Sequence, residues 1–311
     1  MVDLILFGDC KETLKQFPRG SAQMCVTSPP YYGLRDYGGE ANQIGQEETP
    51  EEFVNNLVEV FREVRDVLKD DGVLWLNIGD SYYNYRPGTG GLPKQTVSKT
   101  SQDLPTQCNR RANKLDGLKE KDLIGIPWML AFALRADGWY LRQDIIWHKP
   151  NPMPESVKDR CTKSHEYIFL LSKNKKYYYD NEAIKAPVKQ DWGTRNRVAG
   201  KYHNPGTGLQ PHSGLTKSYE RKNKRDVWSV TNKPYKGAHF ACFPPDLIEP
   251  CILAGSREGD VILDPFMGSG TTAMVAKQHD RSYIGCELHE DYGSLIQKRL
   301  KAIPTKLPFN V

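Results

Sequence analysis

The chain has 311 residues and a mass of 35.4 kDa, with 38% hydrophobic residues, 26% charged residues and a mean hydropathy of −0.63. These values are ordinary for a folded protein, and they exclude a disordered chain, a peptide hormone and a lone binding module. The 43 basic and 38 acidic residues leave a net charge of +5, which suits a polyanionic partner. No apolar run approaches the roughly 20 residues needed to cross a bilayer, so membrane insertion is not expected.

Seven cysteines are scattered along the chain without a Cys-x-x-Cys pair. This usage is typical of reduced core or surface thiols in a cytoplasmic protein, and no metal site is predicted. The apolar start of the chain, residues 1–10, is too short for a signal peptide and indicates a buried strand.

Short apolar runs alternate with helical patterns. Thr49 as N-cap, Pro50 and a capping-box Glu52 predict a helix that ends at Asp71-Gly72. Further helices are expected at about 122–136, 246–254, 271–279 and 291–302. The alternation predicts a mostly parallel α/β sheet covered on both faces. About seven strands are expected, at residues 4–7, 23–26, 73–78, 140–147, 167–171, 261–263 and 283–286.

Two stretches break this alternation. Residues 82–121 are rich in Gly, Pro, Gln, Asn and Thr and are predicted to form a long loop or flexible insertion. Residues 185–236 hold twelve basic residues against three acidic ones, a local charge of +9 that exceeds the +5 of the whole chain. Aromatic residues, Trp228 among them, are interleaved with these charges. Such a segment fits a lobe that grips a phosphate backbone, although a solvated surface loop has the same composition.

A glycine-containing turn follows one of the predicted strands. The sequence Val261-Ile-Leu-Asp-Pro-Phe-Met-Gly-Ser-Gly-Thr-Thr272 combines a strand, an acid at its end and a turn into a helix, as at the ligand site of a doubly wound sheet. The absence of a lysine after Gly270 excludes a Walker A loop. Asp264 suits a ligand with an ammonium or sulfonium charge, and Glu287, 23 residues later at the next strand end, suits ribose hydroxyls.

A second motif, Thr27-Ser-Pro-Pro-Tyr-Tyr-Gly-Leu-Arg-Asp-Tyr37, also follows a strand. The paired prolines hold the backbone extended and leave carbonyl groups free to accept hydrogen bonds from a planar amino group. Tyr31 offers an aromatic face on which a base can stack. A plain proline-rich turn is the alternative.

The two motifs together resemble those of amino-methylating DNA methyltransferases that use S-adenosylmethionine, specifically the beta class, in which the catalytic motif precedes the cofactor motif. The segments Asp144–Val157, Ser164–Leu171 and Phe240–Ile248 extend the resemblance over nearly the whole chain. It implies a Rossmann-like seven-stranded methyltransferase sheet, circularly permuted, over residues 1–184 and 237–311. Residues 185–236 then form an inserted basic target-recognition domain.

The resemblance also implies roles for individual residues. The catalytic set is Ser28, Pro29, Pro30 and Tyr31, with Ser28 Oγ and the Pro29 carbonyl accepting from the target amine and Tyr31 stacking on a base flipped out of the duplex. The cofactor set is Asp9, Phe240, Asp264, Pro265, Phe266, Gly268, Gly270, Thr271 and Glu287. Asp9 is assigned to the adenine amino group of the cofactor. An acidic residue of an ordinary turn, without a role in binding, is an equal alternative. The DNA-binding set is Arg195, Arg197, Arg221, Lys222, Lys224 and Arg225.

The expected activity is site-specific methylation of double-stranded DNA at the exocyclic N4 of cytosine. Serine at the first motif position favours cytosine in the resembled family, but adenine N6 stays open. Two further alternatives also stay open, namely a non-catalytic DNA-binding protein and a methyltransferase that acts on a protein amide or an RNA amine. We further expect a bacterial or phage-encoded protein, with a companion restriction endonuclease as a possibility. Oligomeric state and recognised DNA sequence are left open.

Overall fold

The computed structural model describes residues 3–33, 43–83, 115, 117–188, 220–232 and 243–303. Its centre is one sheet with the strand order β1-β10-β9-β2-β3-β5-β4-β8. All seven predicted strands lie in this sheet. The strands are β1 Leu4–Phe7, β2 Ala22–Thr27, β3 Leu68–Ile78, β4 Tyr140–His148, β5 His165–Ser172, β8 Val227–Ser229, β9 Val261–Asp264 and β10 Ser282–Glu287.

The directions of these strands decide which residues meet. β1, β10, β9, β2 and β3 are parallel to one another. β5 runs antiparallel to β3 and to β4. The carboxyl ends of the parallel strands and of β4 therefore share one edge of the sheet with the amino end of β5. We call this the carboxyl edge.

The chain order reverses between two adjacent strands, β9 and β2. From β9 the chain passes through helix α5 (Thr271–Gln278) to β10 on one side, whereas from β2 it passes through helix α2 (Pro50–Val67) to β3 on the other. At such a switch point an open α/β sheet forms a crevice beyond the carboxyl ends of its strands. Both predicted motifs begin at this point.

Helix α2 starts as its sequence predicts. Thr49 Oγ1 accepts from the backbone N–H of Glu52, and the Glu52 carboxylate accepts from the N–H of Thr49, so the capping box is complete. The predicted end at Asp71-Gly72 is wrong. Leu68 leaves the helix with extended backbone angles and pairs with Ala22 as the first residue of β3. Its side chain is fully buried, and this burial outweighs the local turn signal.

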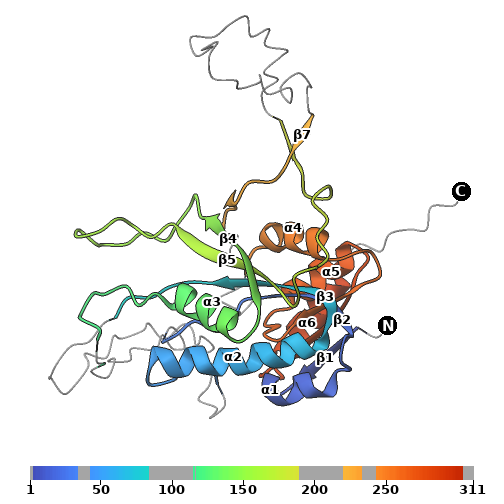
Figure 1. Cartoon of the computed structure of the whole chain (residues 1–311), viewed down its shortest axis with the longest axis horizontal. Coiled ribbons are helices and arrows are strands. Elements are labelled where there is room, and N and C mark those ends of the chain that lie inside the picture. Colours follow the sequence, from blue (N-terminus) through green and yellow to red (C-terminus); the bar gives the residue numbers. More distant parts are fainter. Residues whose placement is uncertain are drawn as a thin grey trace, which may run out of the picture.

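Helices cover both faces of the sheet, and Figure 1 shows α2 and α3 (Ile126–Ala136) on one side with α4 (Pro245–Gly255) and α5 on the other. The first face carries a core around Phe53, Phe61 and Phe169, which α1 (Cys10–Thr13) also joins. The second face carries a core around Trp75 and Ile252, to which α6 (Tyr292–Lys301) adds Ile296. The two cores hold the carboxyl edge as one rigid platform.

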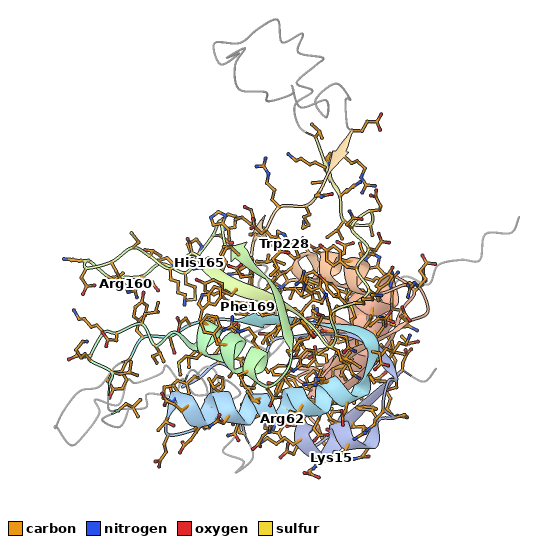
Figure 2. The ribbon with its side chains drawn as sticks, viewed as in Figure 1. Lys15, Arg62, Arg160, His165, Phe169 and Trp228 are labelled. Atoms are coloured by element: carbon orange, nitrogen blue, oxygen red, sulfur yellow. The ribbon has the colours of Figure 1, made fainter. Side chains whose placement is uncertain are left out.

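Part of the basic segment also belongs to the main sheet. β8 pairs with β4 in parallel and is an eighth strand that the sequence did not predict. Trp228 on β8 is buried, with its ring 6.3 Å from that of Trp75, so this aromatic residue anchors the segment in the core instead of facing a ligand (Figure 2). Beyond β8, the ribbon of β6 (Ala186–Pro187) and β7 (Arg221–Lys222) projects from the body as an arm (Figure 1).

The cysteines in the described ranges are free thiols. Cys161 is exposed, and the other four are buried: Cys10, Cys25, Cys251 and Cys286. Among the helices that the structure describes, none has both the length and the apolar character required to span a bilayer.

Candidate active site

The serine-proline motif and the glycine turn meet at the carboxyl edge. β2 and β9 are hydrogen-bonded neighbours, with Cys25 opposite Leu263. The last residue of β2, Thr27, donates its hydroxyl proton to Asp264 Oδ1 across 2.6 Å. Ser28, the residue after Thr27, therefore lies close to Asp264, although Thr27 and Asp264 are 237 residues apart in the sequence. The two motifs therefore meet at one edge of the sheet.

Asp264 is buried and holds neighbouring segments together by hydrogen bonds. Its Oδ1 also accepts from the N–H of Phe266 at 3.0 Å, and its Oδ2 accepts from the Thr272 hydroxyl at 2.6 Å. One carboxylate thus ties together the end of β2, the turn and the first residues of α5. Burial raises the pKa of Asp264 to about 6, although the hydrogen bonds from Thr27 and Thr272 favour its charged form.

The glycine turn after Asp264 is held close to β10. The N–H of Met267 donates to the Cys286 carbonyl at 2.9 Å, and a Cβ on Gly285 would clash with Met267 Cε. Gly268 and Gly270 have φ values of +52° and +77°, which glycine adopts without strain. Arg299 of α6 fastens the turn by donating to Ser269 and to the Thr271 hydroxyl. Pro265 and Phe266 complete this turn.

Glu287 ends β10 beside the turn, as the sequence predicted. Its Oε2 accepts from the N–H of Gly268 at 2.7 Å, and its Oε1 accepts from the N–H of His289 at 3.0 Å. Burial raises the pKa of Glu287. The buried Nε2 of His289 has no hydrogen-bond partner in the described part of the chain. The turn and these polar groups form a cradle at the switch point.

Asp9 stands one strand further along, at the end of β1. Its Oδ1 accepts from the N–H of Lys11 at 2.8 Å and so caps α1. Gly8 donates to the Glu287 carbonyl, which brings Asp9 near the cradle. Phe240, the remaining predicted cofactor residue, lies outside the described residues, as do Arg195 and Arg197.

The serine-proline motif lies across the end of β3. Pro29 is buried, while Ser28, Pro30 and Tyr31 are partly exposed. The Tyr31 ring covers Gly79, where a Cβ would lie 2.6 Å from Tyr31 Cε2. Only glycine at position 79 lets the ring lie this close to β3.

A polar network that the sequence analysis did not predict holds Tyr31. The Tyr31 hydroxyl donates to Glu166 Oε2 at 2.7 Å, and the Asn77 amide nitrogen is 3.3 Å from the same oxygen. The other Glu166 oxygen forms an ion pair with Lys149, whose ammonium group also lies 4.2 Å from the centre of the Trp147 ring. Lys149 follows β4 and Glu166 begins β5. The one feature of the sequence that could have indicated this network is that Lys149 and Glu166 lie beside the ends of predicted strands.

The described DNA-binding candidates lie on the arm and its base. Arg221, Lys224 and Arg225 are exposed, and Lys222 is partly exposed. Arg221 donates to the Lys185 carbonyl at 3.1 Å, and the Lys224 ammonium group lies 4.8 Å from the centre of the Trp228 ring. The arm is thus a basic surface that extends from the sheet beside β4.

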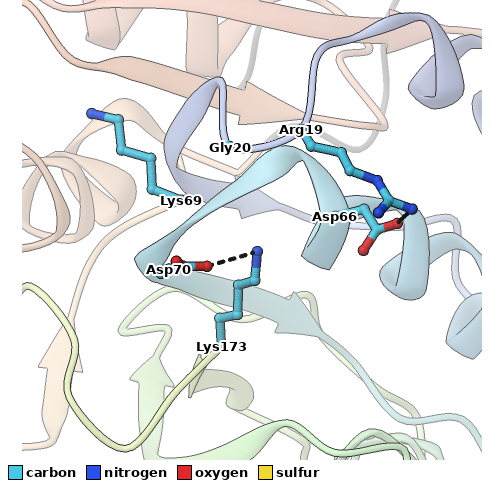
Figure 3. Close-up of a pocket in the computed structure, with 6 residues that line it drawn as sticks. All are labelled: Arg19, Gly20, Asp66, Lys69, Asp70 and Lys173. Carbon is cyan, nitrogen blue, oxygen red and sulfur yellow. Dashed lines mark ion pairs between the residues drawn. The ribbon is translucent and has the colours of Figure 1, made fainter.

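A cavity of about 480 Å³ lies at the opposite edge of the sheet, between Gly20 and Lys173 (Figure 3). Its charged groups form ion pairs: Arg19 pairs with Asp66 and Lys173 with Asp70, while Lys69 pairs with Asp260 outside the cavity lining. Since it lies at the opposite edge from Ser28 and Asp264, it is separate from the candidate active site.

The fold is that of DNA methyltransferases. The solved structure of the PvuII DNA methyltransferase (cytosine-N4-specific) is similar over 99% of this chain and 87% of that protein, with a TM-score of 0.62 and 18% identity. The M1.HpyAVI–SAM complex is similar over 96% of this chain and 99% of that protein, with a TM-score of 0.54 and 17% identity.

The sequence comparisons define the family. A family model described as DNA methylase matches residues 22–298. The type II methyltransferase M.Cfr9I of Citrobacter freundii is 47% identical over 300 residues, covering 96% of this chain and 88% of that protein. M.SmaI of Serratia marcescens is 47% identical over 296 residues, covering 95% and 90%. The chain belongs to the N4/N6 DNA methylase family and is a DNA methyltransferase that uses S-adenosylmethionine.

The residues at the switch point fit this cofactor. When bound, S-adenosylmethionine supplies a methyl group on a positively charged sulfur. The two buried acids match its positive charges and hydroxyl groups, and the glycine turn leaves backbone N–H groups at the start of α5. The cradle therefore has the donor and acceptor set that an amino acid joined to a nucleoside requires.

Proposed function

We propose that the enzyme methylates the exocyclic N4 of cytosine in double-stranded DNA, at a base extruded from the helix. The observation that carries this proposal is the hydrogen bond between Thr27 and Asp264, because it joins the serine-proline motif to the cofactor cradle. An amine held by Ser28 then faces a methyl donor held by the glycine turn. The reaction needs no cysteine nucleophile, since the nitrogen attacks the methyl carbon directly. The bond from that carbon to sulfur breaks, so that sulfur leaves as a neutral thioether, and the methylated nitrogen loses one proton.

In the proposed mechanism the chain activates the amine by hydrogen bonding. The lone pair of an exocyclic amino nitrogen is delocalised into the ring, which makes it a poor nucleophile. If Ser28 Oγ and the Pro29 carbonyl accept its two N–H groups, the nitrogen is drawn toward tetrahedral geometry with its lone pair toward the methyl group. Tyr31 stacks on the base, and Pro30 holds the backbone extended between them.

For the cofactor we propose contacts that follow from the geometry of the cradle. Backbone groups of the Pro265–Thr271 turn contact the methionine part, and Glu287 accepts from the ribose hydroxyls. Asp264 serves mainly by holding this turn against Thr27 and Thr272, because three of its four lone pairs are already engaged. Asp9 is proposed for the adenine amino group of the cofactor, and Phe240 for packing near the cofactor.

We assign DNA recognition to residues 185–236, with catalysis in residues 1–184 and 237–311. The exposed basic side chains Arg221, Lys222, Lys224 and Arg225 support phosphate contacts by the arm. Arg195 and Arg197 are proposed for the same role. The similarity to type II methyltransferases supports a companion endonuclease with the same recognition sequence.

Cytosine is preferred to adenine because Ser28 is a neutral acceptor at the first position of the motif, as is common in cytosine-N4 enzymes of the resembled class. The similar fold of a protein described as cytosine-N4-specific agrees with this choice. The test is nucleoside analysis of plasmid DNA treated with purified enzyme and S-adenosylmethionine. N4-methylcytosine is expected, and N6-methyladenine alone would reverse the base assignment. Base-resolution sequencing of the same DNA gives the recognised site.

A further inference from the structure

Met153 is the most exposed large hydrophobic residue that the structure describes, with 82% of its surface accessible. It lies in the β4–β5 loop (residues 149–164), which leaves the carboxyl edge directly after Lys149. Figure 1 shows this loop extending past the sheet, and Figure 2 labels Arg160 on it. The loop therefore starts at the edge where Ser28 and the Tyr31 network lie.

Single exposed apolar side chains are common on proteins, but the backbone around this one is restrained. Prolines flank Met153 on both sides, at positions 152 and 154, and Pro150 precedes them. Each proline fixes its own φ angle and disfavours helical geometry in the residue before it. The backbone of this segment is thus extended and stiff, and the long, flexible side chain of Met153 lies at its centre.

Hydrogen bonds brace the loop on both sides of Met153. On one side Asn151 and Asn232 exchange two bonds, with Asn151 Nδ2 donating to the Asn232 carbonyl at 3.2 Å and the Asn232 N–H donating to Asn151 Oδ1 at 3.1 Å. On the other side Glu155 accepts from Arg160 at 2.6 Å and from the Lys163 N–H at 3.2 Å. These contacts fix the loop on both sides of Met153, whose side chain is exposed.

Besides Lys149, the β4–β5 loop carries three basic residues, Lys158, Arg160 and Lys163, and two acidic ones, Glu155 and Asp159. Lys158 is exposed, and the guanidinium group of Arg160 lies 4.1 Å from the centre of the Tyr82 ring, at the start of the next loop of the same edge. Flexible apolar side chains, methionine among them, are what DNA-bending proteins insert between base steps.

We propose that Met153 is a wedge that enters the base stack of duplex DNA where the target base has left it. The inference rests on the proposed function, because only an enzyme that extrudes its target leaves such a gap. Insertion stabilises the extruded state by restoring apolar contact for the neighbouring bases. Met153 acts on the equilibrium between stacked and extruded base and takes no part in methyl transfer.

The test measures single-turnover methylation rates on two duplexes, one fully paired and one with an abasic site opposite the target base. We expect Met153→Ala to lower the rate on the paired duplex by about tenfold, because the cost of unstacking the target base is no longer offset. The abasic duplex should restore the rate to within about threefold of the unaltered enzyme, since an unpaired base leaves the stack more easily. Met153→Leu keeps an apolar wedge and should behave as the unaltered enzyme, as should Leu4→Ala at the far edge strand.

A 2-aminopurine base beside the target provides a second measurement, with weaker fluorescence on binding Met153→Ala than on binding the unaltered enzyme. An unchanged rate on the paired duplex, or an equal loss on both duplexes, would overturn the wedge. The product formed by the unaltered enzyme tests the proposed function separately. If that product is N6-methyladenine, the base assignment is wrong, and the ratio of the two rates with a target adenine decides the wedge.

Discussion

The hydroxyl of Thr27 donates to the carboxylate of Asp264 across 2.6 Å, at the point where β2 and β9 end side by side. This bond joins the two halves of the candidate active site, and the carboxylate that accepts it is buried. The Ser28 backbone and the glycine turn therefore keep a fixed spacing before any ligand binds. Such preorganisation suits a reaction that depends on placing a nitrogen in line with a methyl group.

The raised pKa of Asp264 predicts a specific dependence of stability on pH. The folded-state pKa is about 6, against an ordinary value of 3.8, so the folded protein binds this proton more tightly than the unfolded chain. The stabilisation is complete below about pH 3.8 and is lost as the pH rises through 6. About two pKa units correspond to on the order of 3 kcal/mol.

Asp264→Asn provides the comparison, because an asparagine can accept from Thr27 and donate to Thr272 without titrating. We expect the free energy of unfolding of the natural protein to fall relative to that of Asp264→Asn between pH 4 and pH 7. Urea denaturation at several pH values measures this difference. Parallel pH profiles for the two proteins would contradict the assigned pKa.

Ser28→Ala should abolish the activation of the target amine and leave the cofactor cradle intact. Removal of one preorganised hydrogen-bonding group at a reacting centre costs about 10²- to 10³-fold in rate. We therefore expect a loss of this size in the single-turnover rate, with unchanged affinity for S-adenosylmethionine in equilibrium binding. Thr27→Val is the matched control for the neighbouring hydroxyl and should weaken cofactor binding instead. A Ser28→Ala enzyme of normal rate would remove this serine from the mechanism.

The Tyr31–Glu166 hydrogen bond predicts coupled effects of two substitutions. Tyr31→Phe keeps the aromatic face and loses the hydroxyl, while Glu166→Gln weakens the acceptor and leaves Lys149 without its ion pair. Each should lower kcat without changing the KM for S-adenosylmethionine, and the double variant should lose less than the two single losses combined. We expect a coupling of about 0.5 to 3 kcal/mol.

Lys149→Met separates the ion pair from the tyrosine contact in this cycle. If Glu166 positions Tyr31, Lys149→Met should couple more weakly to Tyr31→Phe than Glu166→Gln does. Thermal unfolding of each variant identifies any loss of rate that reflects instability alone. Additive effects of Tyr31→Phe and Glu166→Gln on kcat would mean that the two residues act independently.

The contrast between Asp264 and Glu166 shows how far the sequence predicts this site. Asp264 and Glu287 follow short apolar runs, and parallel strands place such residues at one edge, so both were predicted. Glu166 begins a strand, and it reaches the same edge only because β5 is antiparallel to its neighbours. Strand direction is decided by tertiary pairing, which the apolar pattern does not contain.

Thr27 and β8 were missed for a related reason. The bond of Thr27 to Asp264 spans 237 residues, so no local pattern indicates it. β8 has three residues within a strongly basic segment, and its pairing with β4 and the burial of Trp228 outweigh that polar composition. The end of α2 was likewise moved from Asp71-Gly72 to Val67 by the pairing of Leu68 with Ala22.

The basic arm predicts how DNA binding depends on salt. Affinity falls with salt concentration by a logarithmic slope of about 0.9 for each phosphate contact, because each contact releases a condensed counterion. If Arg221, Lys222, Lys224 and Arg225 each contact a phosphate, replacing all four with glutamine should reduce this slope by about 3 to 4. Fluorescence anisotropy with labelled duplex at several salt concentrations measures it, and cofactor affinity should not change.

A matched control replaces four basic residues on other surfaces, namely Lys15, Arg62, Lys175 and Lys176. Lys15 and Arg62 lie on the side of the molecule opposite the arm (Figure 2), and Lys175 and Lys176 follow β5 at the other edge of the sheet. The control changes net charge by the same amount, so it should weaken binding only through the long-range field and leave the slope nearly intact. Equal slopes for the two quadruple variants would show that net charge, and not contact by the arm, governs DNA binding.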